Sequence, residues 1–208
     1  MKKTRKILLI SAVSCIIIGI VLIICSVSAA GYRMENLLRD KRVKNLTEIS
    51  VPFDSIDIQT NLDSVSFVSA EGSGAAIEMY EGDKAHYTVE VQDGKLTIRY
   101  DDNREWYSFM SLHFPTSREL KLFLPSDTYK SVVIKTNIGS VTIPDSFRIE
   151  ELSVSADIGS VKVPKATGAD KDSTEIHTGI GSVTVDKKES SDNQNIRIDT
   201  GIGDIHVN

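Results

Sequence analysis

The sequence predicts an all-β, β-solenoid-like repeat domain built from coils of about 20–22 residues and preceded by one N-terminal transmembrane helix. Three observations predict this class. Four similar segments each contain a glycine corner, apolar and polar residues alternate on both sides of every corner, and a charge-free apolar run stands near the N-terminus.

The apolar run covers positions 7–25 and contains no charged side chain. At about 1.5 Å per residue it nearly spans the roughly 30 Å of a bilayer's hydrocarbon core. We therefore expect residues 1–30 to form a short tail and a retained single-pass anchor. The alternative is a cleavable signal peptide, because Ser28–Gly31 offers small residues to a peptidase.

The charges around this run favour one orientation. Lys2, Lys3, Arg5 and Lys6 precede it and favour a cytoplasmic N-terminus, although a second basic cluster follows within residues 31–45. We expect a localisation in the cell membrane, with a juxtamembrane stalk over 31–49, helical or irregular, and a β-domain over 50–208 outside the cytoplasm.

The sequence of the first half of the domain predicts ordinary strands. Alternating segments at 75–80, 85–91 and 95–100 are typical of strands, and Asp93-Gly94 predicts a tight hairpin between the last two. Leu120, Leu122 and Leu124 alternate in "ELKLFLP" (119–125), which we expect to lead into the repeats.

Residues 101–118 break the pattern and are rich in aromatic side chains. Two interpretations remain open for this segment: a loop that caps one end of the solenoid, or an exposed patch that binds a partner. The residues of the possible interaction patch are Trp106, Tyr107, Phe109 and Phe114.

The repeats are "VIKTNIGSVTIP" (133–144), "SVSADIGSVKVP" (153–164), "EIHTGIGSVTVD" (175–186) and "RIDTGIGDIHVN" (197–208), with a degenerate copy, "DIQTNLDSVSFV", at 57–68. The glycine that follows the corner isoleucine recurs at a nearly constant interval, and an aspartate takes that place in the degenerate copy. The predicted structural corner residues are Asp63, Gly139, Gly159, Gly181 and Gly203.

The apolar pattern predicts the shape of each coil. Ile176, Thr178 and Ile180 fall on even positions, whereas Val183 and Val185 fall on odd ones, so a two-residue corner keeps all of them inward. Glycine supplies a positive φ at such a corner, and aspartate tolerates left-handed geometry. Matching threonines predict a hydroxyl ladder along the stack: Thr60, Thr136, Thr178 and Thr200.

The glycine pairs do not predict a nucleotide site. A phosphate-binding Gly-rich loop needs a helix after it, and here a β-branched strand follows. His86, His113, His177 and His206 occupy unrelated places, and the corner serines have no histidine beside them. We therefore expect no catalytic residues, no metal, no cofactor and no enzymatic activity.

The charge composition of the domain makes nucleic acid an unfavourable partner. Residues 46–208 carry 15 Lys and Arg against 27 Asp and Glu, a net charge of −12, which disfavours nucleic-acid binding. Both cysteines, Cys15 and Cys25, lie in the apolar run, so the domain contains no disulfide.

An N-terminal apolar segment, a "DGKLTI" hairpin, a "LKLFLP" strand and repeats of the form I-x-T-x-I-G-S-V-x-V together resemble the bacterial putative-adhesin, or toast-rack, family. The resemblance covers about residues 50–208, with Asp63 and Ala156 as departures from the repeat. It implies an all-β repeat domain at the cell envelope, without catalytic residues.

The function we expect is that of a membrane-anchored adhesin or interaction scaffold that binds protein or envelope polymer. Two alternatives are an accessory component of envelope-stress signalling and a carbohydrate-active β-helix enzyme. Weak self-association is a further expectation, because the last repeat ends at Asn208 without a capping segment in this sequence.

Overall fold

The computed structural model describes residues 13–22, 25, 43–72, 74–82, 85–102, 118–164, 173–186 and 195–207. It divides into two compact units, one with residues 1–40 and 106–114, the other with 41–105 and 115–208. In the first unit, residues 13–22 are helical. Among the described residues no helix is both long and apolar enough to cross a bilayer. Residues 7–12, 23 and 24 of the predicted span (7–25) lie outside the described residues.

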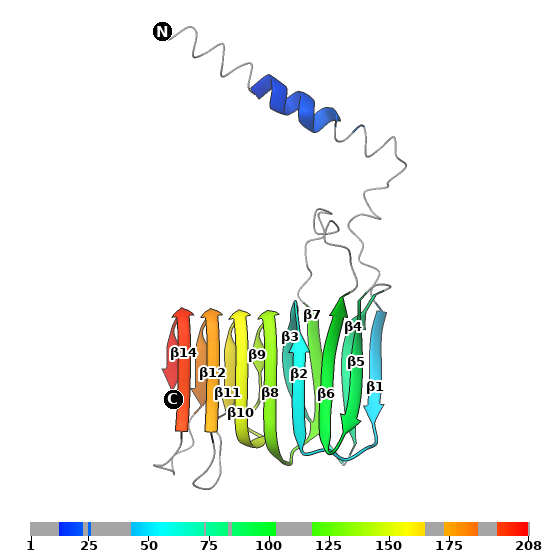
Figure 1. Cartoon of the computed structure of the whole chain (residues 1–208), viewed down its shortest axis with the longest axis vertical. Coiled ribbons are helices and arrows are strands. Elements are labelled where there is room, and N and C mark those ends of the chain that lie inside the picture. Colours follow the sequence, from blue (N-terminus) through cyan, green and yellow to red (C-terminus); the bar gives the residue numbers. More distant parts are fainter. Residues whose placement is uncertain are drawn as a thin grey trace. The chain divides into compact units, whose positions relative to one another are not determined.

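The second unit is made of strands arranged in two sheets (Figure 1). The strands are β1 (Val43–Ile49), β2 (Ser55–Thr60), β3 (Asp63–Ala70), β4 (Ala75–Glu81), β5 (Ala85–Gln92), β6 (Lys95–Asp102), β7 (Arg118–Pro125), β8 (Thr128–Ile138), β9 (Val141–Thr142), β10 (Arg148–Ile158), β11 (Val161–Pro164), β12 (Ser173–Ile180), β13 (Val183–Asp186), β14 (Asn195–Ile202) and β15 (Ile205–Val207).

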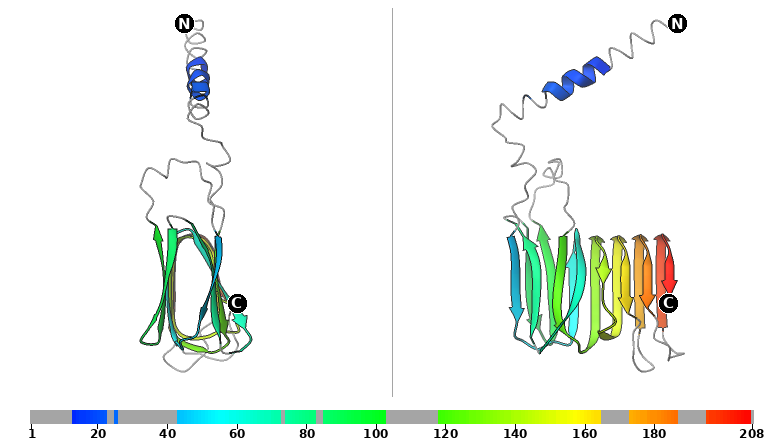
Figure 2. Two further views of the ribbon diagram at one scale, coloured as in Figure 1. Left: turned by 90° about the vertical axis from the view of Figure 1, so that its right-hand side faces the viewer. Right: turned by 180° about the vertical axis from the view of Figure 1, so that it is seen from behind.

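The two sheets face each other across one apolar interior, as the view along the stack in Figure 2 shows. One sheet has the order β1-β4-β7-β3-β9-β11-β13-β15 and the other has β14-β12-β10-β8-β2-β6-β5. A rung consists of one strand from each sheet and the corner that joins them. The rungs β8–β9, β10–β11, β12–β13 and β14–β15 stack in parallel and in register.

The degenerate copy is a true rung of this stack. Its strands β2 and β3 pair in parallel with β8 and β9, with Thr60 opposite Thr136 and Val65 opposite Val141. The chain reaches β8 only after β4–β7, so β2–β3 lies between β6–β7 on one side and β8–β9 on the other. The repeat alignment therefore predicts a spatial contact between segments that are far apart in the sequence.

The predicted strands of the first half are confirmed, with Asp93-Gly94 as the turn between β5 and β6. Both turn residues have positive φ, 51° and 75°, as the tight hairpin turn requires. The expected stalk is wrong at its end. Val43–Ile49 form β1, which pairs antiparallel with β4, so the β-unit starts before residue 50.

Burial follows the predicted alternation within the strands. In β12, Thr174, Ile176 and Thr178 are buried while Glu175 and His177 between them are exposed. Fully buried side chains from both sheets meet in the interior and form one continuous core. At the turns opposite the corners, the rings of Phe67 and Phe147 pack edge to face with centroids 5.7 Å apart.

Candidate interaction surface

The corners are built by close contact between successive rungs. A Cβ atom on Gly181 would lie 1.8 Å from the carbonyl oxygen of Gly159, and one on Gly139 would lie 2.4 Å from that of Asp63. Gly181 also has a φ of 155°, a region open almost only to glycine, whereas Gly139 is not among the residues with positive φ. Glycine is needed at these places chiefly because the next backbone leaves no room for a side chain.

The amide groups of the corners are already used. The Gly139, Gly159 and Gly181 N–H groups each donate to the isoleucine carbonyl of the next rung at 2.9 Å. The corner serines continue the ladder, since the Ser160 N–H donates to the Ser140 Oγ at 3.3 Å. A phosphate cradle needs free N–H groups pointing at the ligand. These corners are therefore part of the architecture.

The aspartate at the fifth corner behaves differently from the prediction. Asp63 does not adopt the left-handed conformation, because Asp93 is the one non-glycine residue with positive φ in the described part of the chain. The residue is 2% exposed, and its carboxylate accepts a hydrogen bond from the Tyr87 hydroxyl. On that side Asp63 neighbours β6–β7, whose connecting residues 103–117 contain no glycine and lie outside the described residues.

The threonine ladder is interrupted. Thr60 and Thr136 both donate to the Asp63 carbonyl, at 3.2 and 3.3 Å. Ala156 then takes the equivalent place in the next rung, opposite Thr136 on one side and Thr178 on the other. The Thr178 hydroxyl is buried and has no hydrogen-bond partner among the described residues.

The corners carry an apolar ridge that the sequence analysis placed in the core. Ile138, Ile158, Ile180 and Ile202 are 48%, 46%, 50% and 69% exposed, in register from rung to rung, with the partly buried Leu62 at the matching place in β2–β3. We call these five residues the corner ridge.

The expectation that these isoleucines point inward is wrong, and the reason is the width of the corner. Thr178 is the last buried residue before the turn and Val183 is the first after it. Two facing sheets lie about 10 Å apart, so the chain needs four residues to cross between them. Ile180 lies on the outside of that arc.

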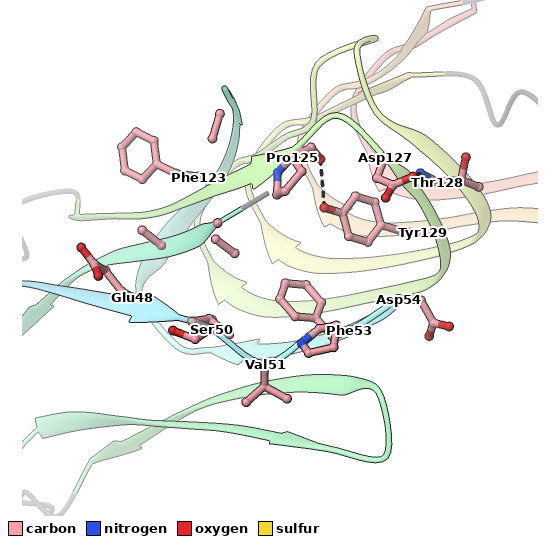
Figure 3. Close-up of a pocket in the computed structure, with 16 residues that line it drawn as sticks. Glu48, Ser50, Val51, Phe53, Asp54, Phe123, Pro125, Asp127, Thr128 and Tyr129 are labelled. Atoms are coloured by element: carbon pink, nitrogen blue, oxygen red, sulfur yellow. Dashed lines mark hydrogen bonds between the residues drawn. The ribbon is translucent and has the colours of Figure 1, made fainter. Parts of the chain in front are cut away.

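A cavity of about 660 Å³ lies at the turns opposite the corners, between the segment that follows β1, the end of β3 and the β7–β8 turn (Figure 3). Phe53 and Tyr129 line it, with ring centroids 6.3 Å apart. Burial, and secondarily the charge of Asp127, raises the pKa of Tyr129 to about 12, so this hydroxyl stays protonated and donates to the Pro125 carbonyl.

Two of the carboxylates that line this cavity, those of Asp54 and Asp127, have partners inside the protein. The Asp54 carboxylate accepts from the Ser55 hydroxyl and lies 2.5 Å from Lys130 Nζ. The hydrogen bonds from Lys130 and Ser55 hold the pKa of Asp54 below its usual range, and the bond to Asp54 raises the pKa of Lys130. Asp127 Oδ1 accepts from the Thr128 N–H at 2.7 Å. The cavity therefore combines aromatic surface with carboxylates that are already paired at Asp54 and Asp127.

Among the described residues, the histidines named by the sequence are not brought together in one place. His177 lies 3.4 Å from Asp199 on the next rung, with both side chains more than half exposed, and His206 is on the opposite sheet. In the described ranges no three His, Cys, Asp or Glu side chains could hold a metal ion. His113 and the possible patch of Trp106, Tyr107, Phe109 and Phe114 lie outside the described residues.

The fold and its surface define a class of protein: a stack of β-rungs whose repeated residues build corners and an exposed ridge. The family profile Toastrack DUF4097 matches residues 53–208, and the chain belongs to this family. The family resemblance is thereby confirmed. A search of curated proteins gave no match.

Solved structures of adhesin-like proteins are similar to parts of this chain. A putative cell adhesion protein from Clostridium sporogenes is 13% identical with a TM-score of 0.56, and the alignment covers 80% of this chain and 99% of that one. A putative adhesin from Parabacteroides distasonis is 19% identical with a TM-score of 0.40, over 81% of this chain and 75% of that one. A putative adhesin from Bacteroides fragilis is 14% identical with a TM-score of 0.31, over 81% and 99%. At 13% identity, the likeness to the first structure shows the fold alone.

Sequence reasoning missed the corner ridge, the Asp63–Tyr87 pair and the cavity. The ridge could have been found from one signal: the isoleucine at each corner lies next to the glycine, where the alternation on the two sides changes parity. The other two arise from residues far apart in the sequence, and no local pattern contains them.

Proposed function

We propose that this chain is a non-enzymatic, membrane-anchored protein of the cell envelope that uses its β-repeat domain as an adhesin-like interaction scaffold. The observation that carries the proposal is the corner ridge. Isoleucine recurs at the same exposed place in four successive rungs, where the core does not need it. Contiguous exposed apolar residues of this kind mark interaction sites.

The ridge favours a protein partner over a polar envelope polymer. Its five residues follow one another at about 4.8 Å per rung, which gives an apolar line of roughly 19 Å. Asn61, Asn137 and Asp157 precede the first three of these residues, so the line has a polar margin on one side. An apolar line with a polar rim is the usual anatomy of a protein interface. The adhesion named for the Clostridium sporogenes structure agrees with such a role.

Anchoring and exposure belong to the same proposal. The charge-free run at 7–25 supports a membrane span, and the basic residues before it support a β-unit outside the cytoplasm. Membrane fractionation followed by protease treatment of intact cells tests both. The full chain should sediment with membranes and lose its β-unit to external protease. Recovery of the full chain in the soluble fraction would contradict the anchor.

The ridge is tested by substitution in the full chain. Ile158→Ser combined with Ile180→Ser should abolish capture of the envelope partner in crosslinking pull-downs from intact cells. The control is Val43→Ser with Leu46→Ser, two residues of β1 that are 64% and 61% exposed. Capture that survives in the ridge variant, with unchanged circular dichroism, would contradict the proposal. Loss of the envelope-stress response on deletion of the chain would favour the signalling alternative instead.

A further inference from the structure

Among the described residues, β14–β15 is the outermost rung at one end, and its inward side chains are more exposed than those of the neighbouring rung. Ile176 in the neighbouring rung is 0% exposed, whereas its in-register partner Ile198 is only partly buried. On the other sheet Val185 is 0% exposed, whereas Val207 opposite it is 51% exposed. Within the described residues, β14 and β15 have no neighbour on their outer sides.

At the opposite end of the unit, polar and charged side chains bond across the edge strands. There β1 and β5 are the edge strands, and Glu81 connects the two sheets. Its carboxylate accepts from the Tyr87 N–H of β5 at 2.8 Å and from the Asn45 side chain of β1. The Lys44 ammonium of β1 lies 2.8 Å from Glu78. Charged, internally bonded side chains are how proteins protect an edge strand from pairing.

We propose that two copies of this chain pair through their β14–β15 rungs, with β14 antiparallel to β14 of the second copy about a two-fold axis. This inference goes beyond the proposed function, because it concerns the stack's open end and leaves the corner ridge free. A two-fold axis perpendicular to the sheets extends both sheets and places the two exposed apolar faces against each other. Such an isologous contact closes at the dimer.

Charge selects one register for this pairing. Residues directly opposite in an antiparallel pair point to the same side, so inward Ile196, Ile198 and Thr200 can only face one another. With Ile198 opposite Ile198, Arg197 of each copy faces Asp199 of the other. A shift by one pair in either direction places Arg197 opposite Arg197 or Asp199 opposite Asp199. Only the central register of the three pairs opposite charges.

The neighbouring rung supports the same arrangement. Arg197 already lies 3.7 Å from Glu175, and Asp199 lies 3.4 Å from His177. In the dimer each guanidinium would stand between two carboxylates, one from its own stack and one from the second copy. Each Asp199 would likewise stand between His177 and an arginine.

Cysteine scanning along β14 tests the pairing in the full chain, with Cys15 and Cys25 changed to serine. Opposite residues of an antiparallel pair have Cα atoms about 4.5–5.5 Å apart, within disulfide range. Ile198→Cys should form a covalent dimer under mild oxidation in detergent micelles. Ile202→Cys is the matched control, since the register separates the two copies of this residue by about eight residues, roughly 26 Å. Crosslinking at Ile202→Cys, or none at Ile198→Cys in a natively folded protein, would overturn the proposal.

A charge swap supplies the second test, by mass photometry of the uncrosslinked full chain. Arg197→Asp should weaken the dimer at least about tenfold, and Arg197→Asp combined with Asp199→Arg should restore it. Failure of the double variant to dimerise, with unchanged circular dichroism, would overturn the register. A ladder of trimers and larger species in the parent protein would mean head-to-tail stacking and would also overturn it.

Discussion

At the scale of the residue, the corner glycines decide whether the rungs can stack. The sequence suggested that their role is a positive φ, but the short approach to the next carbonyl applies also at Gly139, where φ is not positive. The shared requirement is therefore the missing Cβ. Asp63 stands at the rung beside β6–β7, whose connecting residues 103–117 contain no glycine in the sequence.

Gly181→Ala should lower the free energy of unfolding by about 3 kcal/mol, because the added methyl meets the Gly159 carbonyl at 1.8 Å and φ is unfavourable. Urea unfolding followed by circular dichroism measures the change. Ser182→Ala at the same corner should be nearly silent and serves as the control. Equal stabilities for the two variants would show that the rungs do not approach as closely as described.

Replacement by valine should have opposite effects on stability at two of the buried threonines. The Thr178 hydroxyl has no hydrogen-bond partner among the described residues, so Thr178→Val should raise the free energy of unfolding by about 1 kcal/mol. Thr136→Val removes the bond to the Asp63 carbonyl and should lower it by a similar amount. Thermal unfolding of both variants measures the difference, and a loss of stability in Thr178→Val would indicate an unseen partner.

At the scale of the element, Asp54 connects three strands. Its N–H donates to the Gly94 carbonyl at the β5–β6 turn, its carbonyl accepts from the Lys130 N–H of β8, and its carboxylate pairs with the Lys130 ammonium. The segment before β2 is thereby joined to its two neighbours. Asp54 also lines the cavity.

This pair predicts a pH dependence. The Asp54 pKa is lowered in the folded protein, so its contribution to stability is present above the unfolded value of about 3.9 and is lost as pH falls through the folded pKa. Carboxyl-carbon NMR titration of the parent and of Lys130→Met measures it. The Asp54 pKa should rise in Lys130→Met, and an unchanged pKa would contradict the pairing.

The strands show what the sequence could and could not predict. The Asp93-Gly94 hairpin and β7 were predictable because turn chemistry and alternation are local signals. The first strand, β1, was not, because Val43 and Leu46 are exposed and its sequence does not alternate. It is a strand through pairing with β4, a contact that a local pattern does not encode. The outward Ile180 was mispredicted for a related reason, because sheet separation sets the corner's width.

At the scale of the whole β-unit, the stacking order differs from the chain order. The similarity of residues 57–68 to residues 133–144 predicted that β2–β3 and β8–β9 are equivalent rungs. It did not predict that β6–β7 pairs with the other side of β2–β3, since those strands carry no corner motif. The ridge and the open end at β14–β15 are likewise properties of the assembled stack, which a single repeat does not show.

The central claim is that these rungs stack in register across long stretches of chain, and one disulfide measures it directly. Ser66 of β3 is paired with Thr142 of β9, although β4–β8 separate the two strands along the chain. In the full chain without Cys15 and Cys25, Ser66→Cys with Thr142→Cys should close an intramolecular disulfide under mild oxidation, because neighbouring strands bring paired Cα atoms to about 4.8 Å. Two free thiols in a folded, oxidised protein would contradict the account.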